Sequence, residues 1–326
     1  MDVIARLLLG ESKPMQQLRS LVVRLAGSEA AVLIEGPTGS GKELVAEALH
    51  LCSARPGAFV PFNVCAIGDG TFESAVFGHA RGGFTGAVHD VPGYLAEADR
   101  GTVFFDEISS LPLTVQPKLL RALETKSFRP VGARHDRTSH FRLVAASNCD
   151  LSALVDQGRF RADLLHRLRA LAIRVPSLVE HIEDVPLLAQ HFARQLSGGL
   201  VSRFDTAASR RLMEHTWPGN VRELRNVVEF ALRLAEGEVV GAVEISRALE
   251  GRRHVPPRDD LSWLRQQLVT MVADCDGDIA RVAERLGMHS SNVYRRMRRL
   301  GIDTPKRRYL PLASGTDSQP PRVASS

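Results

Sequence analysis

The 326-residue sequence contains only four cysteines, Cys52, Cys65, Cys149 and Cys275, and they are far apart in the chain. No two of them form a CxxC pair. The eleven histidines are equally scattered, without a pair at metal-ligand spacing near acidic residues. These absences argue against a disulfide framework and against a structural zinc site. We therefore expect reduced, packed thiols and no structural metal.

Long hydrophobic runs are absent as well. No stretch approaches the ~18 consecutive apolar residues of a membrane-spanning helix, and the N-terminus becomes charged too soon for a secretory signal. With 44% hydrophobic residues the chain can still bury a substantial core. Its length suggests about two or three domains. We expect a soluble, cytoplasmic protein without a membrane partner.

The net charge of +5 is concentrated at the C-terminal end of the chain. Residues 252–308 carry 13 Lys and Arg against 7 Asp and Glu, a balance of +6, so the rest of the chain sums to −1. A local basic excess favours a polyanionic partner such as nucleic acid, and a solvated basic face is the alternative.

The N-terminal half is organised around GPTGSGKE, residues 36–43. This stretch follows an apolar run at 31–34 and opens a helical pattern, which is the strand, glycine-rich turn and helix order of a phosphate-binding loop. Backbone N–H groups of such a loop surround phosphates, and the lysine reaches the outer ones. We expect a nucleoside triphosphate site made of Gly36, Pro37, Thr38, Gly39, Ser40, Gly41, Lys42 and Glu43.

Residues 59–62 form a second predicted strand that ends at Asn63, and a third, apolar strand, 102–105, runs directly into Asp106 and Glu107. This pair suits hydrolysis, because Asp106 at the strand tip can hold Mg²⁺ while Glu107 polarises the attacking water. A further strand, 142–146, delivers Asn148 to the same edge of the sheet, where a polar side chain can sense the terminal phosphate. The cofactors expected from these motifs are ATP and Mg²⁺.

Residues 77–90 contain four glycines in nine residues around one aromatic, Phe84. A flexible loop that exposes a phenylalanine has little reason to exist for packing alone, although an ordinary surface loop is the alternative. Farther along, Arg161 and Arg167 flank Asp163. They form either a solvated helix face or a pair that reaches the ATP of a neighbouring subunit.

From residue 183 onward the strand patterns disappear, and we interpret the region as a helical lid. Its helical patterns cover residues 185–196, 206–215 and 221–235. Arg222 lies in the first turn of the last pattern, well placed to approach phosphates if the lid folds over the nucleotide.

A charged linker, 251–260, precedes a final helical unit with a short turn at 287–289 and a helix capped by Ser290. This is helix-turn-helix form, and a small dimerising bundle is the alternative. The residues expected to contact DNA are Ser290, Ser291, Asn292, Tyr294, Arg295, Arg296, Arg298 and Arg299. Residues 305–326 hold four prolines and lack periodicity, so we expect a disordered tail.

Together these motifs resemble the bacterial sigma-54-dependent activators, also called enhancer-binding proteins, over about residues 9–302. GGFTGA is similar to the GAFTGA loop with which this family contacts sigma-54, with Gly83 in place of the usual alanine. GPTGSGKE resembles the family's Walker A motif, including the glutamate at position 43. The implied sigma-54 contacts are Gly82, Gly83, Phe84, Thr85, Gly86 and Ala87.

The resemblance also implies a catalytic and sensing set. Its members are the Walker B pair Asp106 and Glu107, the switch residue Asn63, the sensor I pair Ser147 and Asn148, the trans-acting arginine fingers Arg161 and Arg167, and the sensor II residue Arg222. Tyr94, Ala96 and Val179 stand where the family commonly has Arg, Glu and Arg. None of these departures removes a catalytic group.

The implied fold is α/β: an AAA+ P-loop ATPase with an αβα core and a helical lid, followed by an all-α Fis-type helix-turn-helix domain. The expected domains are the core at 1–178, the lid at 179–250, the linker at 251–260, the DNA-binding domain at 261–304 and the tail at 305–326. Only about a dozen residues precede the first helical pattern, residues 15–26. The chain is therefore most similar to short activators of the phage shock protein F type, which a separate protein controls.

The implied function is an ATP-hydrolysing transcription activator, by resemblance a hexamer. It would bind double-stranded DNA upstream of a promoter and remodel the closed complex of sigma-54 RNA polymerase into the open complex. The alternative is a DNA-bound regulator, a repressor or an activator of ordinary polymerase, that does no remodelling. Since glycine makes the GGFTGA loop more flexible than alanine would, we expect Gly83→Ala to be tolerated and even to strengthen coupling.

Overall fold

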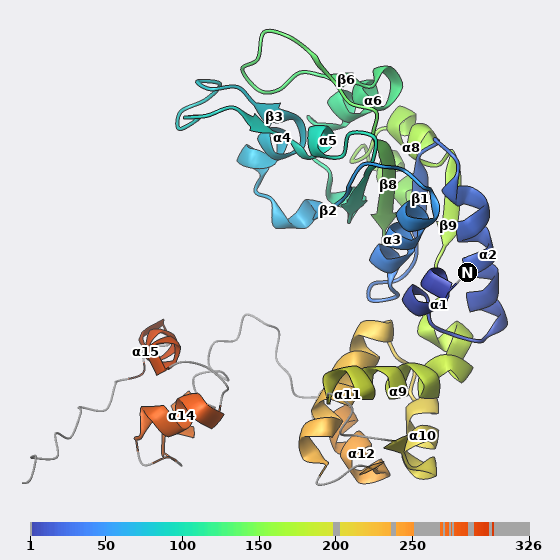
Figure 1. Cartoon of the computed structure of the whole chain (residues 1–326), viewed down its shortest axis with the longest axis vertical. Coiled ribbons are helices and arrows are strands. Elements are labelled where there is room, and N and C mark those ends of the chain that lie inside the picture. Colours follow the sequence, from blue (N-terminus) through green and yellow to red (C-terminus); the bar gives the residue numbers. More distant parts are fainter. Residues whose placement is uncertain are drawn as a thin grey trace, which may run out of the picture. The chain divides into compact units, whose positions relative to one another are not determined.

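The computed structural model describes residues 2–197, 203–235 and 239–250, together with residues 268, 269, 271–273, 275, 277–285, 290–299 and 302. The chain divides into two compact units, residues 1–251 and 252–326. The first unit holds an α/β core and a helical lid, and the second holds two described helices (Figure 1).

The core is built on a parallel five-stranded sheet with the strand order β2-β5-β8-β1-β9. Its strands are β1 (Val32–Glu35), β2 (Phe59–Asn63), β5 (Thr102–Asp106), β8 (Arg142–Ser147) and β9 (Leu171–Arg174). The four predicted strands are confirmed to within one residue at each end. The edge strand β9 was not predicted, because its four residues include only one fully buried side chain, Ile173.

Helices cover both faces of the sheet. One face packs against α1 (Asp2–Leu7), α2 (Lys13–Ala26) and α3 (Lys42–Cys52). The other packs against α4 (Asp69–Phe77), α5 (Tyr94–Glu97), α6 (Gln116–Thr125), α7 (Leu151–Asp156) and α8 (Ala162–Leu168). Short 3₁₀ turns follow two strand tips, at η1 (Val64–Ala66) and η2 (Ile108–Ser110).

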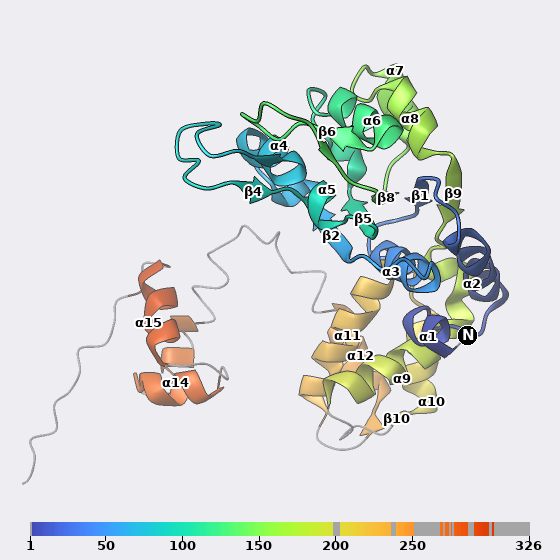
Figure 2. The same cartoon turned by 45° about the horizontal axis from the view of Figure 1, so that its top comes forward.

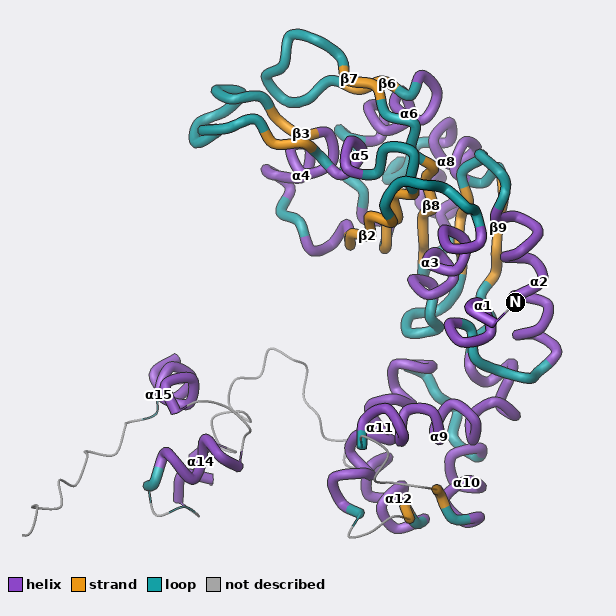
Figure 3. The backbone as a smooth tube through the Cα atoms, viewed as in Figure 1, coloured by secondary structure: helices purple, strands orange, loops and turns teal. Residues whose placement is uncertain are grey.

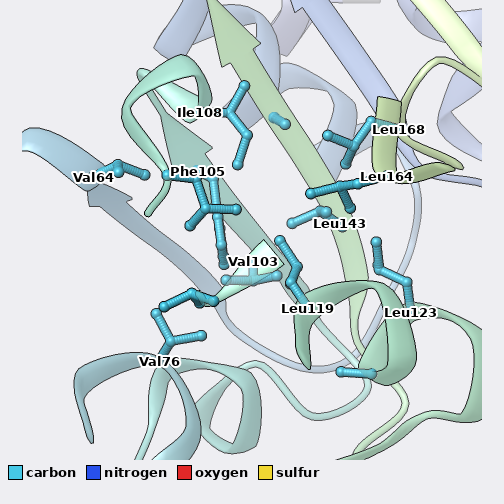
Figure 4. Packing of buried hydrophobic residues seen from close by; sticks show 14 of the residues in the cluster. Val64, Val76, Val103, Phe105, Ile108, Leu119, Leu123, Leu143, Leu164 and Leu168 are labelled. Atoms are coloured by element: carbon cyan, nitrogen blue, oxygen red, sulfur yellow. The ribbon is translucent and has the colours of Figure 1, made fainter. Parts of the chain in front are cut away.

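Side-chain alternation along the strands explains the two layers. On β5, Val103 and Phe105 belong to the core cluster on the α6 side, whereas Phe104 belongs to the cluster with α2 and α3. Figure 4 shows Val103 and Phe105 beside Leu119 of α6 and Leu143 of β8. Every described strand residue from 102 to 105 is buried, as a central parallel strand requires.

Helix α6 begins at Gln116, although the apolar helical pattern in the sequence already starts at residue 113. Residues 113–115 form a turn, and Pro117 lies in the first turn of the helix. A proline there removes no helical hydrogen bond, because the first N–H groups of a helix have no partner inside it.

Two antiparallel hairpins extend from the core. The first pairs β3 (Gly78–His79) with β4 (Val91–Pro92), and the second pairs β6 (Ser127–Phe128) with β7 (Arg137–Thr138). Neither hairpin was predicted, since strands of two residues carry no readable alternation. The glycine-rich segment is therefore the loop of the first hairpin, and Figure 2 shows it extending beyond β4.

The lid consists of η3 (Leu178–Asp184), α9 (Val185–Leu196), α10 (Thr206–Met213), α11 (Asn220–Leu234) and α12 (Ala242–Glu250). These helices bury Trp217, whose indole N–H donates to the carbonyl oxygen of Leu212 at 2.9 Å. The expectation that strands end at residue 183 is wrong. β10 (Arg203–Phe204) and β11 (Val239–Val240) form a small parallel pair within the lid (Figure 3).

In the second unit, α14 (Ile279–Arg285) packs against α15 (Ser290–Arg299). The buried contacts come from Ile279, Val282 and Ala283 on the first helix and from Val293 and Met297 on the second. Asp278 accepts a hydrogen bond from the backbone N–H of Ala280 at 2.9 Å and caps α14. Ser290 is the first helical residue of α15 and not a residue before it. The predicted linker, turn and tail lie outside the described residues.

The four cysteines are free. Cys275 is buried, but Cys52, Cys65 and Cys149 are exposed, so the expectation of packed thiols is wrong for three of the four. Among the described helices, none is long and apolar enough to cross a membrane.

Candidate functional site

The phosphate-binding loop joins β1 to α3 at the carboxyl edge of the sheet. Gly39 and Gly41 have φ angles of 78° and 93°, which favour glycine. A Cβ atom at Gly39 would lie 2.4 Å from the carbonyl oxygen of Gly219 in the lid. Glycine is therefore required at position 39 for two independent reasons, the backbone conformation and the close approach of the lid.

Lys42, the first residue of α3, is folded back on this loop. Its Nζ atom donates to the carbonyl oxygens of Gly36 at 2.9 Å and Pro37 at 3.1 Å. Burial lowers the pKa of the lysine, while the carboxylates of Glu107 and Asp106 oppose that shift. The ammonium group is thus already placed among the loop's carbonyls, and it would exchange them for phosphate oxygens when nucleotide binds.

The loop also contains a buried polar atom without a partner. The hydroxyl oxygen of Ser40 is the buried side-chain atom that lacks a hydrogen-bond partner within the described part of the chain. Buried polar groups in native proteins are nearly always paired, so an unpaired one indicates a ligand or water. Together with the lysine and the glycine backbone, this hydroxyl fits a bound triphosphate.

Asp106 and Glu107 lie across from the loop, at the tip of β5. Both line a hollow of about 290 Å³ together with Lys42 and Arg222. Burial and the neighbouring carboxylate of Asp106 raise the pKa of Glu107, and the cations Lys42 and Arg222 oppose the shift. Glu107 has left-handed backbone angles, φ 57° and ψ 46°, which cost energy in a residue other than glycine. A carboxylate of raised pKa is suited to accept a proton.

Asn63 contacts Asp106, and not Glu107, in this structure. Its amide nitrogen donates to Oδ2 of Asp106 at 3.5 Å, and its amide oxygen accepts from the backbone N–H of Cys65 at 2.8 Å. Residues 63 and 106 are register partners on neighbouring strands. The switch role therefore stays a prediction, and it requires the amide to move from one carboxylate to the other.

Asn148 reaches the phosphate-binding loop, whereas Ser147 does not. The amide nitrogen of Asn148 donates to the hydroxyl of Thr38 at 3.2 Å. Ser147 is buried, and its hydroxyl donates to the carbonyl oxygen of Cys149 at 2.8 Å. Within the predicted sensor I pair, Asn148 is the residue that contacts the phosphate-binding loop, and the sensor role stays a prediction.

The lid contacts the phosphate-binding loop through the start of α11. The backbone N–H of Arg222 donates to the carbonyl oxygen of Gly39 at 3.2 Å, and its side chain lines the hollow. Asn220, which is buried, donates to the carbonyl oxygen of Thr38 at 3.0 Å and accepts from the N–H of Leu178 at 2.9 Å. Asn220 was not among the predicted site residues, although its place directly after Pro-Gly at a helix start was a usable signal.

A second, more apolar hollow of about 370 Å³ adjoins the first. Residues 7–9, Leu188 and Phe192 are among those that line it. The two hollows share Gly41 of the loop and Leu44 of α3, so they lie next to each other. An apolar hollow next to a phosphate site suits a planar base. No sequence motif marks these residues, so they could not be predicted from the sequence.

Arg161 and Arg167 line neither hollow, and both side chains are exposed at α8. Arg161 forms an ion pair with Asp163 at 2.7 Å. Its backbone N–H donates to the buried side-chain oxygen of Gln116 at 2.8 Å, which fixes the start of the helix. The solvated pair and the trans-acting pair both fit this geometry, so the finger role stays a prediction.

The GGFTGA loop presents its two larger side chains to solvent. Phe84 is 46% exposed, and Thr85 is exposed beside it. Gly82 and Gly86 have φ angles of 76° and 98°, and the N–H of Gly82 donates to the carbonyl oxygen of Ala87 at 2.8 Å. The loop is thus a defined turn that exposes an aromatic ring, as an interaction surface requires.

The loop packs against the β6–β7 hairpin, and this contact explains the glycine at position 83. The backbone N–H of Ala80 donates to the carbonyl oxygen of Val131 at 2.9 Å. A Cβ atom at Gly83 would lie 2.6 Å from that same oxygen, and one at Gly132 would lie 2.2 Å from the Cα of Gly83. The expectation that alanine is tolerated at position 83 is therefore wrong, because the space is filled by backbone.

We predict that Gly83→Ala separates the two hairpins. Overpacking of this kind costs ~1 to 3 kcal/mol, so the backbone amide protons of Ala80 and Val131 should exchange with solvent faster than in the parent, measured by hydrogen exchange. Gly27→Ala is the control, since a Cβ atom there meets nothing within 4 Å. Unchanged exchange at both amides in Gly83→Ala would contradict the contact.

Two of the three departures from the family pattern contribute to packing. The ring of Tyr94 stacks on Phe62 with centroids 4.7 Å apart, and Ala96 packs against the same core cluster. Val179 is 54% exposed. The structure gives no reason for a valine at that position.

All the residues predicted to contact DNA lie on α15. Val293 and Met297 point into the core of the second unit, and the side chains of Tyr294 and Arg298 are exposed. The first helix supports the second through this core, which is the arrangement of a helix that presents its outer face to DNA.

Comparison with known proteins identifies the class. Residues 8–174 match the sigma-54 interaction domain family and residues 179–261 match the AAA+ ATPase lid domain. The chain belongs to the family of sigma-54-dependent regulators, and its core is an AAA+ ATPase domain.

Several relatives are known. The response regulator protein PilR of Pseudomonas aeruginosa is 39% identical over 311 residues, which cover 91% of this chain and 70% of PilR. The DNA-binding transcriptional regulator NtrC of Azospirillum brasilense is 45% identical over 72% of this chain and 49% of its own length. The chain spans between 46% and 70% of the curated relatives named here and of VasH from Vibrio cholerae.

The crystal structure of NtrX from Brucella abortus in complex with ATP superimposes with a TM-score of 0.68 at 32% identity. The match covers 90% of this chain and 69% of NtrX. The same protein has also been solved in complex with ADP. The α/β core with a helical lid is therefore the fold of a nucleotide-binding relative.

Proposed function

We propose that this chain is an ATP-hydrolysing transcription activator that remodels the closed complex of sigma-54 RNA polymerase into the open complex. The observation that carries the proposal is that Lys42, the carboxylate pair and Arg222 line one hollow, while Phe84 and Thr85 are exposed on a separate hairpin. A regulator without remodelling would need neither the paired carboxylates nor the exposed loop.

In this proposal each residue has a defined task. Ser40, Lys42 and the backbone of the loop bind the triphosphate, and Asp106 holds Mg²⁺, which neutralises phosphate charge when bound. Glu107 accepts a proton from the attacking water. Asn148 and Arg222 detect the terminal phosphate from the sheet and from the lid. The apolar hollow holds the base.

The remaining parts of the proposal concern assembly and partners. Arg161 and Arg167 reach the ATP of a neighbouring subunit, so that activity requires an oligomer, by family resemblance a hexamer. The outer face of α15 binds double-stranded DNA upstream of the promoter. The domain boundaries after residues 178, 250, 260 and 304 and a cytoplasmic location are proposals of the same kind.

The loop supplies the test that separates remodelling from its alternative. We predict that Phe84→Ala and Thr85→Ala retain ATP hydrolysis, because neither residue lines the nucleotide hollows. Open-complex formation at a sigma-54 promoter should be lost, since these are the loop's two sizeable contact groups. The measurements are phosphate release and permanganate footprinting of promoter DNA with the same preparation.

Phe230→Ala is a matched control, because this phenylalanine is 45% exposed on the lid, close to the 46% of Phe84. It should activate transcription as the parent does. If the two loop variants also activate as the parent does, the loop is not the polymerase contact and the DNA-bound regulator becomes the better proposal.

A further inference from the structure

A buried aspartate at the start of the lid binds the N-terminal segment. Asp184, the last residue of η3, is 2% exposed and lines neither nucleotide hollow. Its Oδ1 atom accepts hydrogen bonds from the backbone N–H groups of Glu11 at 2.7 Å and Ser12 at 3.0 Å. Its Oδ2 atom accepts from the hydroxyl of Ser12 at 2.5 Å and lies 3.2 Å from Nδ1 of His181. One carboxylate therefore binds both the N-terminal segment and His181 at the start of the lid.

The bound segment is held from its other side as well. Arg19 of α2 donates from its guanidinium to the carbonyl oxygens of Leu8 at 2.8 Å and Gly10 at 2.7 Å. Gly10 has a φ of +141°, and a Cβ atom there would lie 2.5 Å from Oδ2 of Asp184. The backbone thus passes directly over the carboxylate, in a conformation and at a distance that require glycine.

This segment is continuous with a wall of the apolar hollow. Residues 7–9 line the hollow, and so do Leu188 and Phe192 of α9. Helix α9 begins at Val185, directly after the aspartate. The carboxylate of Asp184 consequently connects the N-terminal segment to the start of α9. Its hydrogen bonds to Glu11 and Ser12 join residues that are 173 and 172 positions apart in the chain.

We propose that Asp184 is a positioning residue for the nucleotide base, because it fixes the N-terminal segment relative to α9 and so sets the width of the apolar hollow. This inference rests on the proposed assignment of that hollow to the base. Asp184 contacts neither the phosphate-binding loop nor the carboxylates of the ATPase set in any described contact. Substitution of Asp184 should therefore weaken the binding of the adenosine part of the ligand and not the binding of its phosphates.

Burial by itself would raise the pKa of Asp184, but the hydrogen bonds from Ser12 and Glu11 outweigh burial and lower the pKa below its usual value. The group therefore stays ionised. Hydrogen bonds to a charged acceptor are stronger than neutral ones, so the segment is held firmly.

Calorimetric titration with ADP and with inorganic pyrophosphate separates the two ends of the site, since the ligands share two phosphates and only ADP carries a base. In Asp184→Ala, the affinity for ADP should fall about tenfold or more, because unpaired buried donors release the segment. The affinity for pyrophosphate should change by less than about twofold. In steady-state hydrolysis, KM for ATP should rise more than kcat falls.

Three further variants make the test independent of folding. Arg19→Ala releases the same segment while Asp184 and the donors that it accepts from stay in place, and it should also weaken ADP binding selectively. Asp184→Asn keeps an acceptor for the two backbone N–H groups, and should recover most of the ADP affinity. Asp205→Ala is the control, because Asp205 caps α10 through the N–H of Ala208 at 2.5 Å and lines neither hollow.

Equal affinity for ADP in Asp184→Ala, Arg19→Ala and the parent would overturn the positioning role. Equal losses of ADP and pyrophosphate would overturn it too, since they would indicate general damage to the unit. If the parent itself binds ADP no more tightly than pyrophosphate, the hollow is not the base site and the inference falls with that assignment. The roles proposed for Lys42 and Glu107 would survive that last result.

Discussion

Glu107→Gln should bind ATP as the parent does and hydrolyse it slowly. Glutamine keeps the size of the side chain and leaves Lys42 and the glycine backbone of the loop in place, so the triphosphate site is retained. What is lost is a carboxylate whose pKa is raised by burial and by Asp106, and which is suited to take a proton from water. Removal of a general base typically costs ~10² to 10⁴ in rate.

The measurement is single-turnover hydrolysis with purified protein, alongside ATP binding at equilibrium. Glu124→Gln is the control, since Glu124 is exposed on α6 and lines neither hollow. If Glu107→Gln hydrolyses ATP within about twofold of the parent rate, the change is far smaller than the removal of a general base causes. That result would assign the proton transfer to another group.

Arg167→Ala should lose hydrolysis by a factor of ~10³ or more, as expected for an arginine that stabilises the transition state of a neighbouring subunit. The side chain is exposed on α8 and lies outside the hollows of its own subunit. Specific activity of the parent should therefore fall steeply on dilution, as subunits separate. Hydrolysis measured across a concentration series, with the oligomer followed by light scattering, tests both statements.

Mixing distinguishes a finger from a structural arginine. Arg167→Ala has an intact nucleotide site, and Glu107→Gln has an intact finger, so mixed assemblies should recover part of the activity that each variant lacks. Arg24→Ala, with an exposed arginine on α2, should behave as the parent. Activity that is constant on dilution, together with a fully active Arg167→Ala, would leave the pair as a solvated helix face.

Most of the ATPase core could be predicted because its motifs sit at strand ends. A glycine loop and a carboxylate pair are readable in sequence, and parallel strands bring their carboxyl ends to one edge. The register pairs Asn63 with Asp106 on neighbouring strands, at the edge where the carboxylate pair was predicted. These predictions need only local patterns and one topological rule.

Contacts between distant segments could not be predicted. The fit of Gly83 depends on Gly132, which belongs to a different hairpin, and flexibility alone gave the wrong expectation. Asn220 and Asp184 act through hydrogen bonds to the loop and to the N-terminal segment. The packing of the lid on the core determines these partners. The spacing of residues within one helix or strand carries no information about that packing.

Permanganate footprinting of a sigma-54 promoter, with purified chain and sigma-54 RNA polymerase, tests the central proposal most directly. We predict that melted thymines appear with ATP, and that none appear with a non-hydrolysable ATP analogue or with Lys42→Ala. Equal melting with ATP and with the analogue would contradict remodelling driven by hydrolysis. So would a promoter that stays closed while the chain hydrolyses ATP.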